Sequence, residues 1–217
     1  MKKFMTIALT FIMLACILSL SACTSVKFLE EKVVLCKTDL LSDEKEQIKL
    51  TCHNFWQKQQ GIKEYLLKFT LSGEVSTSTT YSVKFNLNGK DYLESFSLNP
   101  ISNRLTAYVK IDSFKEKTLS ASVIFANNVI EYNLLSEIPE NTASLKTVLT
   151  NLKDKVPSLI SAYTDKNGNF IADIILKISV INQNYYYYVE FNGEDVKTVA
   201  FLLNALTGEV LAVKNVK

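Results

Sequence analysis

The chain has 217 residues, 47% hydrophobic and 21% charged, with only 6 Gly and 3 Pro, a composition that excludes a disordered or collagen-like protein. Without the first 22 residues, which carry two lysines and no acid, 22 basic residues face 22 acidic ones, so nothing favours nucleic acid as a partner and a basic groove is not expected. A single histidine, His53, excludes most Ser-His-Asp, Cys-His and multi-histidine zinc sites.

The amino-terminal segment, residues 1–22, is predicted to be a signal peptide. Two lysines precede an apolar run over residues 4–19, which has the length typical of such segments. The run leads into LSAC, from Leu20 to Cys23, which resembles the lipobox of bacterial lipoproteins. The resemblance implies that the chain is cut before Cys23, that a diacylglyceryl group (the palmitate-type anchor) is attached there, and that the protein is lipid-anchored on the extracytoplasmic face of the cell membrane. The alternative is a retained signal anchor, because the uncharged stretch over 4–26 is long enough to cross a bilayer.

The mature chain is predicted to consist of a tether over residues 23–31 and two units over 32–138 and 139–217. The division rests on an internal repeat. Its matching segments are LKFTL and LKISV (67–71 and 176–180), YSVKF and YYVEF (81–85 and 187–191), and FSLN and FLLN (96–99 and 201–204). The repeat predicts an α+β fold in which each unit packs a helical segment on a four-stranded antiparallel sheet, the first unit having an extra hairpin at 117–135.

Each unit is expected to begin with its helix. In the first unit the helix is predicted over residues 42–60, with Gly61 as its end. It would gather four side chains on one face, namely Ile48, Cys52, Phe55 and Trp56. In the second unit the helix should start near Thr142 and end before Pro157. Residues 158–164 then form either a second short helix or a first strand.

The last hairpin of the chain carries an asparagine followed by Thr-Gly-Glu-Val, at Asn204, Thr207, Gly208, Glu209 and Val210. This pattern resembles the end of a PepSY-type domain. Two tandem units of helix and four-stranded sheet also resemble beta-lactamase inhibitory proteins. Both resemblances imply a module that binds or inhibits a protein or peptide partner and that has neither catalytic residues nor a cofactor.

No residue pattern indicates catalysis or a metal site. Cys36, Cys52 and His53 are close in sequence but offer at most two converging ligands, fewer than zinc requires. The sequence therefore predicts a non-enzymatic extracytoplasmic lipoprotein that binds a protein or peptide. The alternatives are an envelope hydrolase that uses carboxylates only, and a structural component of the envelope.

Two cysteines of the mature chain, Cys36 and Cys52, are expected to turn inward and lie close together. In an extracytoplasmic protein such a pair can be oxidised to a disulfide. The alternative is two buried thiols, because free cysteine is often part of a core.

An aromatic face is predicted on the second unit. Side chains alternate along a strand, so if Tyr187 and its neighbours face the helix, Tyr186, Tyr188 and Leu202 lie on the opposite face. A monomer seldom leaves such a patch in water. We expect these three residues to contact a partner; the alternative is an internal joint, covered by the first unit or by the hairpin at 117–135.

Overall fold

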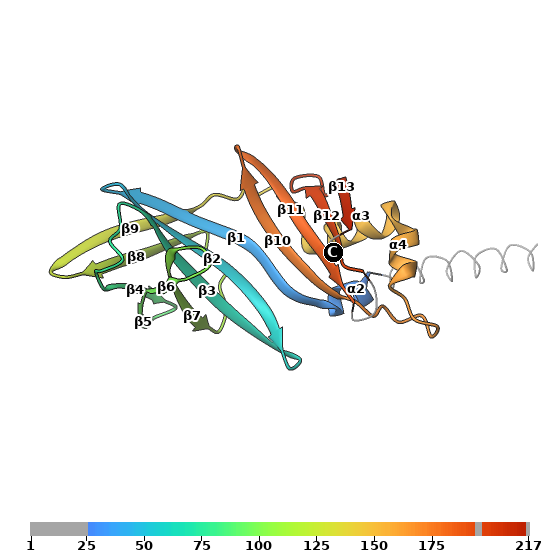
Figure 1. Ribbon diagram of the computed structural model, residues 1–217, viewed down its shortest axis with the longest axis horizontal. Coiled ribbons are helices and arrows are strands. Elements are labelled where there is room, and N and C mark those ends of the chain that lie inside the picture. Colours follow the sequence, from blue (N-terminus) through green and yellow to red (C-terminus); the bar gives the residue numbers. More distant parts are fainter. Residues whose placement is uncertain (1–25, 194–196, 216–217) are drawn as a thin grey trace, which may run out of the picture.

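The computed structural model describes residues 26–193 and 197–215, so Cys23 and its predicted lipid anchor lie outside the described residues. The described residues form three short helices and thirteen strands (Figure 1). The helices are α2 (Lys27–Glu31), α3 (Leu145–Lys155) and α4 (Pro157–Ala162). The strands of the first half are β1 (Val33–Lys45), β2 (Ile48–Gln59), β3 (Ile62–Gly73), β4 (Tyr81–Leu87), β5 (Lys90–Ser95), β6 (Ser97–Asn99), β7 (Arg104–Ile111), β8 (Thr118–Phe125) and β9 (Asn128–Ser136). Those of the second half are β10 (Asp173–Ile181), β11 (Asn184–Asn192), β12 (Val199–Asn204) and β13 (Val210–Asn215).

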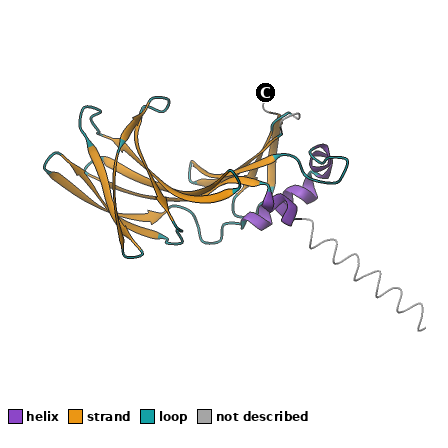
Figure 2. Ribbon diagram, turned by 90° about the horizontal axis from the view of Figure 1, so that it is seen from below, coloured by secondary structure: helices purple, strands orange, loops and turns teal. Residues whose placement is uncertain are grey.

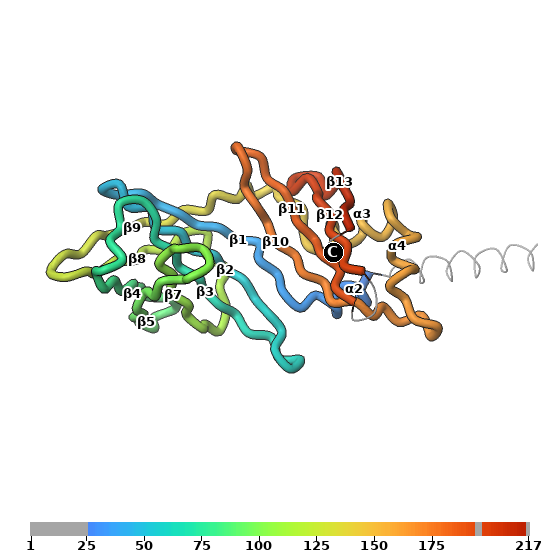
Figure 3. The backbone as a smooth tube through the Cα atoms, in the orientation of Figure 1, coloured from blue at the N-terminus to red at the C-terminus, as the bar shows by residue number. Residues whose placement is uncertain are grey.

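All thirteen strands belong to one sheet, whose main path is β13-β12-β11-β10-β1-β2-β3-β7-β6. The other four strands pair in the order β5-β4-β8-β9. This branch is joined to the main path by β9, which pairs with β1 at Leu41 and Ser42. Neighbouring strands are antiparallel, except that β1 lies parallel to β10. Figure 2 shows the strongly bent sheet with the helices gathered at one end, and Figure 3 shows β1 running from that end toward the other. The first strand thus joins the two halves of the molecule.

The helix predicted over residues 42–60 is wrong, because this segment is strand. It supplies the end of β1 and all of β2, which are joined by a tight turn with positive φ at 46–47. Along β2, the side chains of Ile48, Leu50 and Cys52 are buried, and the side chains between them are not. Burial therefore repeats every two residues, as in a strand, and not every three or four.

The predicted α+β fold of two repeats, each with a helix on a four-stranded sheet, is also wrong. Within the described part of residues 32–138 there is no helix. The matching segments also differ in pairing: β10 pairs with β11, whereas their counterparts β3 and β4 do not pair with each other. Instead, β3 pairs with β7, and β4 pairs with β5 and β8. The molecule is one large, mostly antiparallel sheet with helices at one end only.

The likeness between the halves persists in one turn. In the hairpin after β6, the side-chain oxygen of Asn99 accepts hydrogen bonds from the backbone N–H groups two and three residues further along, both at 3.0 Å. Asn204 does the same after β12, at 2.9 and 3.2 Å. Asn103 and Gly208 close the two turns with φ of 50° and 72°. Both turns therefore share a left-handed position, which asparagine and glycine tolerate.

The second half contains the helix and the four strands expected there. The first helix, α3, begins after Ser144, whose hydroxyl oxygen accepts a hydrogen bond from the backbone N–H of Thr147 at 3.1 Å. Its buried face consists of Val148, Leu149 and Leu152. Pro157 begins α4, so the segment after it is a short helix and not a strand.

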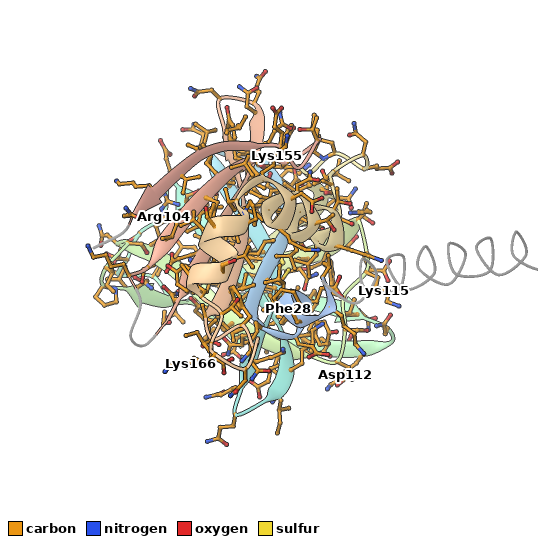
Figure 4. All side chains as sticks on the ribbon, turned by 90° about the vertical axis from the view of Figure 1, so that its right-hand side faces the viewer. Phe28, Arg104, Asp112, Lys115, Lys155 and Lys166 are labelled. Carbon is orange, nitrogen blue, oxygen red and sulfur yellow. The ribbon has the colours of Figure 1, made fainter. Side chains whose placement is uncertain are left out.

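Two hydrophobic cores lie on one side of the sheet. The first core is enclosed by β1–β9, and the second core lies between the helices and β10–β13. The first strand contributes to both, with Leu41 in the first core and Cys36 in the second. The segment predicted to be a tether contains α2, which lies with α3 and α4 at the end of the molecule that faces the viewer in Figure 4. There Leu29 is fully buried, and the ring of Phe28 lies 6.0 Å from that of Phe170.

Candidate functional site

The side of the sheet that faces away from both cores forms a second surface, which we call the open face. On β11, Tyr187 and Val189 are buried in the second core, so alternation places Tyr186 and Tyr188 on the open face. On β2, even-numbered side chains point to the cores. Phe55 therefore lies on the same open face as the two tyrosines.

One row of side chains crosses the open face perpendicular to the strands, and we call it the central row. Each member is directly paired with the next across eight neighbouring strands, from β13 to β7. The members are, in order, Ala212, Leu202, Tyr188, Lys177, Lys37, Phe55, Leu66 and Lys110. The row thus brings apolar, aromatic and basic side chains from both halves of the chain onto one surface.

Two hollows lie along the central row. The tyrosine hollow, of about 380 Å³, is lined by residues of β11, β12 and β13, namely Tyr188, Ala200, Phe201, Leu202, Ala212 and Lys214. The lysine hollow, of about 360 Å³, is lined by Leu35, Lys37, Phe55, Gln57, Lys68, Tyr108 and Lys177. They are neighbours, because Tyr188 of the first pairs directly with Lys177 of the second. Among the described residues, no carboxylate lines either hollow.

The lysine hollow concentrates positive charge. Burial, and then the charges of Lys68 and Lys177, lower the pKa of Lys37 from 10.5 to about 8. Within the described part of the chain, no acid lies within 4.0 Å of the ammonium nitrogen of any of these three lysines. The Nζ atom of Lys68 lies 5.5 Å from the centre of the Tyr108 ring. These lysines therefore lack a counter-ion from the described residues.

His53 lies beside this cluster, paired with Leu40 on one side and Lys68 on the other. Burial and the charges of Lys37 and Lys68 lower its pKa to about 3, so the imidazole is neutral near pH 7. Its Nδ1 atom is buried and has no hydrogen-bond partner among the described residues. The histidine thus adds no charge to the lysine hollow.

Three acids of the described chain lie near the lysine hollow, and each is engaged by another side chain. On the open face, Glu190 accepts a hydrogen bond from the hydroxyl of Tyr188 at 2.9 Å, and burial together with this contact raises the pKa of that hydroxyl. Glu64 pairs with Lys110 at the far end of the central row. On the core side, Asp39 accepts from the side-chain amide of Asn54 at 3.1 Å and lies 3.6 Å from Lys117. None of these carboxylates bridges the clustered lysines.

The structure places the predicted partner-binding residues together in part. Tyr188 and Leu202 are directly paired and line the tyrosine hollow, and both are half-buried. Tyr186 pairs with Asn204 and lines a separate, smaller hollow of about 150 Å³ at the end of the same strands. Their role in binding stays a prediction.

The lysines of the hollow were missed by the sequence analysis, which excluded a basic groove from the even charge balance. That exclusion is wrong locally, because overall neutrality does not prevent a few lysines from meeting on one face. A signal was present: Lys68 and Lys177 occupy the same position in the matching segments LKFTL and LKISV. Both belong to the lysine hollow.

The two cysteines of the described chain are buried free thiols, and the predicted proximity is wrong. In the ladder between β1 and β2, Cys36 is paired with Trp56 and Cys52 with Leu41. Four residues of strand separate the two positions, which is roughly 13 Å, whereas a disulfide requires Cα atoms within about 7 Å. Burial raises the pKa of both thiols, that of Cys36 to about 12. The alternative of two core thiols is what the structure contains.

Comparison of the chain with protein-family models, with curated proteins and with solved structures finds no match in any of the three. Among the described helices, none combines the length and the apolar character needed to cross a membrane. Within residues 26–193 and 197–215, no group of three histidine, cysteine, aspartate or glutamate side chains is arranged to hold a metal ion. The chemistry of the open face therefore has to be judged from its own side chains.

Proposed function

We propose that this protein is a membrane-tethered extracytoplasmic lipoprotein that binds a protein or peptide partner on its open face and has no catalytic activity of its own. The central row carries the proposal, because it joins an apolar hollow to a basic one on a surface outside both cores. Attachment to the membrane through Cys23 remains the prediction made from the lipobox pattern.

The side chains of the tyrosine hollow suit a protein partner. Tyr188 offers a rigid ring with a polar end, and tyrosine is enriched at interfaces for this reason. Leu202 and Ala212 extend the apolar area beside it. Burying apolar surface of this kind against a partner stabilises the complex by about 25 cal/mol per Å² removed from water.

Binding without catalysis agrees with the groups near the hollows. Hydrolysis by carboxylates alone needs two acids at a defined separation across a substrate. Glu190 and Glu64 flank the central row, but each is held by Tyr188 or Lys110 and neither lines a hollow. The neutral His53, with its pKa of about 3, is a weak base.

Affinity capture tests the proposal. The tagged lipoprotein is crosslinked gently in cells, and the proteins captured by the wild type are compared with those captured by a variant carrying Tyr186→Ser and Tyr188→Ser. We expect the double variant to lose the partner and to keep its melting temperature. A matched control, Tyr92→Ser, removes a half-buried tyrosine from β5 and should capture normally. A sharp fall in the melting temperature of the double variant would make this face an internal joint and refute the proposal.

A further inference from the structure

We infer that the partner is acidic: it places two or more carboxylate groups in the lysine hollow and an apolar side chain in the adjoining tyrosine hollow. The partner is that of the proposed function, on which this inference rests. Three observations support it, namely the convergence of the lysines, the apolar side chains that flank them, and the distance between the two hollows.

The lysines converge from three different strands. Lys37 of β1 and Lys177 of β10 are directly paired, so their Cα atoms lie about 4.8 Å apart. Lys68 of β3 enters the same hollow from the other side, beside Tyr108. Like charges at such a distance repel each other. A carboxylate bound among them would turn this repulsion into attraction and accept charge-assisted hydrogen bonds.

The flanking side chains favour a peptide over a long polyanion. In the central row the two lysines are followed by Tyr188 and Leu202 on one side and by Phe55 and Leu66 on the other. A nucleic acid needs cations along its whole path. Here Lys110 at the end of the row is paired with Glu64, so the two lysines in the middle are the members of the row without an acid partner among the described residues. One further lysine, Lys214, lines the tyrosine hollow. A ligand that fits must carry a few charges next to apolar groups, as an acidic peptide segment does.

The distance between the hollows sets the spacing within that segment. At about 4.8 Å per strand, Leu202 lies roughly 10 Å from Lys177 and roughly 14 Å from Lys37. An extended peptide advances about 3.3 Å per residue. The apolar side chain is therefore expected three or four residues away from a pair of aspartates or glutamates.

Fluorescence anisotropy with defined peptides tests the inference. The probe is a fluorescein-labelled decapeptide in which two adjacent aspartates lie three or four positions from a leucine. In the comparison peptide asparagines replace the aspartates. The proteins are the mature chain, Lys37→Gln, and the control Lys84→Gln, which changes an exposed lysine of β4. Thermal unfolding of each variant verifies that it is folded.

We expect the acidic peptide to bind the wild type and Lys84→Gln alike, and the asparagine peptide to bind about tenfold more weakly, a difference of ~1.4 kcal/mol. Lys37→Gln should remove most of this difference, and added salt should reduce it. If both peptides bind the wild type equally and neither binds Tyr188→Ser, the inference of an acidic partner is wrong and the proposed function stands. Lys37-dependent binding of phosphatidylglycerol vesicles or single-stranded DNA in place of the peptide would overturn the inference. If the wild type binds neither peptide and captures no partner from cells, both the inference and the proposed function are refuted.

Discussion

Replacing Lys37 by methionine is expected to stabilise the fold while weakening the binding of an acidic partner. Methionine keeps an unbranched side chain of similar length and removes the ammonium group. In the free protein that group is half-buried beside Lys68 and Lys177, without a counter-ion from the described residues. A charge kept at a cost to stability is expected where the charge serves binding.

The magnitude follows from the pKa of Lys37, which falls from 10.5 to about 8 on folding. This corresponds to about 3 kcal/mol against the charged form, which we reduce to about 1–2 kcal/mol because water still reaches the group. Below pH 8 the lysine is charged in the folded and the unfolded state, so the fold bears the whole cost there. Between pH 8 and 10.5 the folded protein releases the proton first, and the cost disappears as the pH rises.

Thermal unfolding of wild type and variant measures this difference. Near pH 7 the melting temperature of Lys37→Met should be about 2–8 °C above that of the wild type, and the gap should narrow near pH 10. The control Lys84→Met replaces an exposed lysine of β4 and should change the melting temperature little. A lower melting temperature for Lys37→Met, or a gap that is the same at both pH values, would refute the reasoning.

Three further predictions concern the anchor, the thiols and a turn. Cys23→Ser should leave the precursor uncut and unlabelled by a palmitate analogue, and a retained label would disprove lipidation at this residue. Non-reducing mass spectrometry should find Cys36 and Cys52 as free thiols that react with maleimide only after unfolding, because both are buried and their pKa values are raised. Gly73→Ala should lower the unfolding free energy by at least ~2 kcal/mol, because φ is +92° and the new methyl carbon would lie 2.1 Å from the carbonyl oxygen of Gln47. Gly61→Ala, with φ of +80° and open space around it, should cost only about 1–2 kcal/mol; equal losses for both would contradict the steric argument.

The second half of the fold was predictable because local signals agree there. Pro157 follows a helical run, and a serine near the expected start caps it. The hairpin turns at Asn182 and Gly208 take left-handed conformations that asparagine and glycine tolerate. Each strand from β10 to β13 pairs with the next in sequence, so no long-range pairing had to be guessed within this part.

The first half was mispredicted because its apolar spacing fits two periods. Positions 48, 52 and 56 are separated by four residues, which suits one helical face and equally suits one face of a strand. Leu50 resolves the ambiguity, since it is buried with Ile48 and Cys52 in a period of two. Phe55 and Trp56, read as neighbours on one helix face, point to opposite faces of β2. The long strands β1–β3 are stabilised mainly by contacts with distant strands, which a short sequence window does not contain.

Only part of the candidate site could be predicted from the sequence, because the rest depends on pairing between distant strands. Alternation along one strand is local, so it identified Tyr188 as a member of the face opposite the helices. The lysine hollow depends on the parallel pairing of β1 with β10, which aligns Lys37 with a lysine 140 positions later in the chain. Parallel neighbours need a long crossover, and here the rest of the sheet intervenes. The β1–β10 pairing places Lys37 beside Lys177, which in turn pairs with Tyr188 of the tyrosine hollow. Shifting β1 by two residues against β10 would therefore keep both cores covered yet separate the charges that the proposed partner requires.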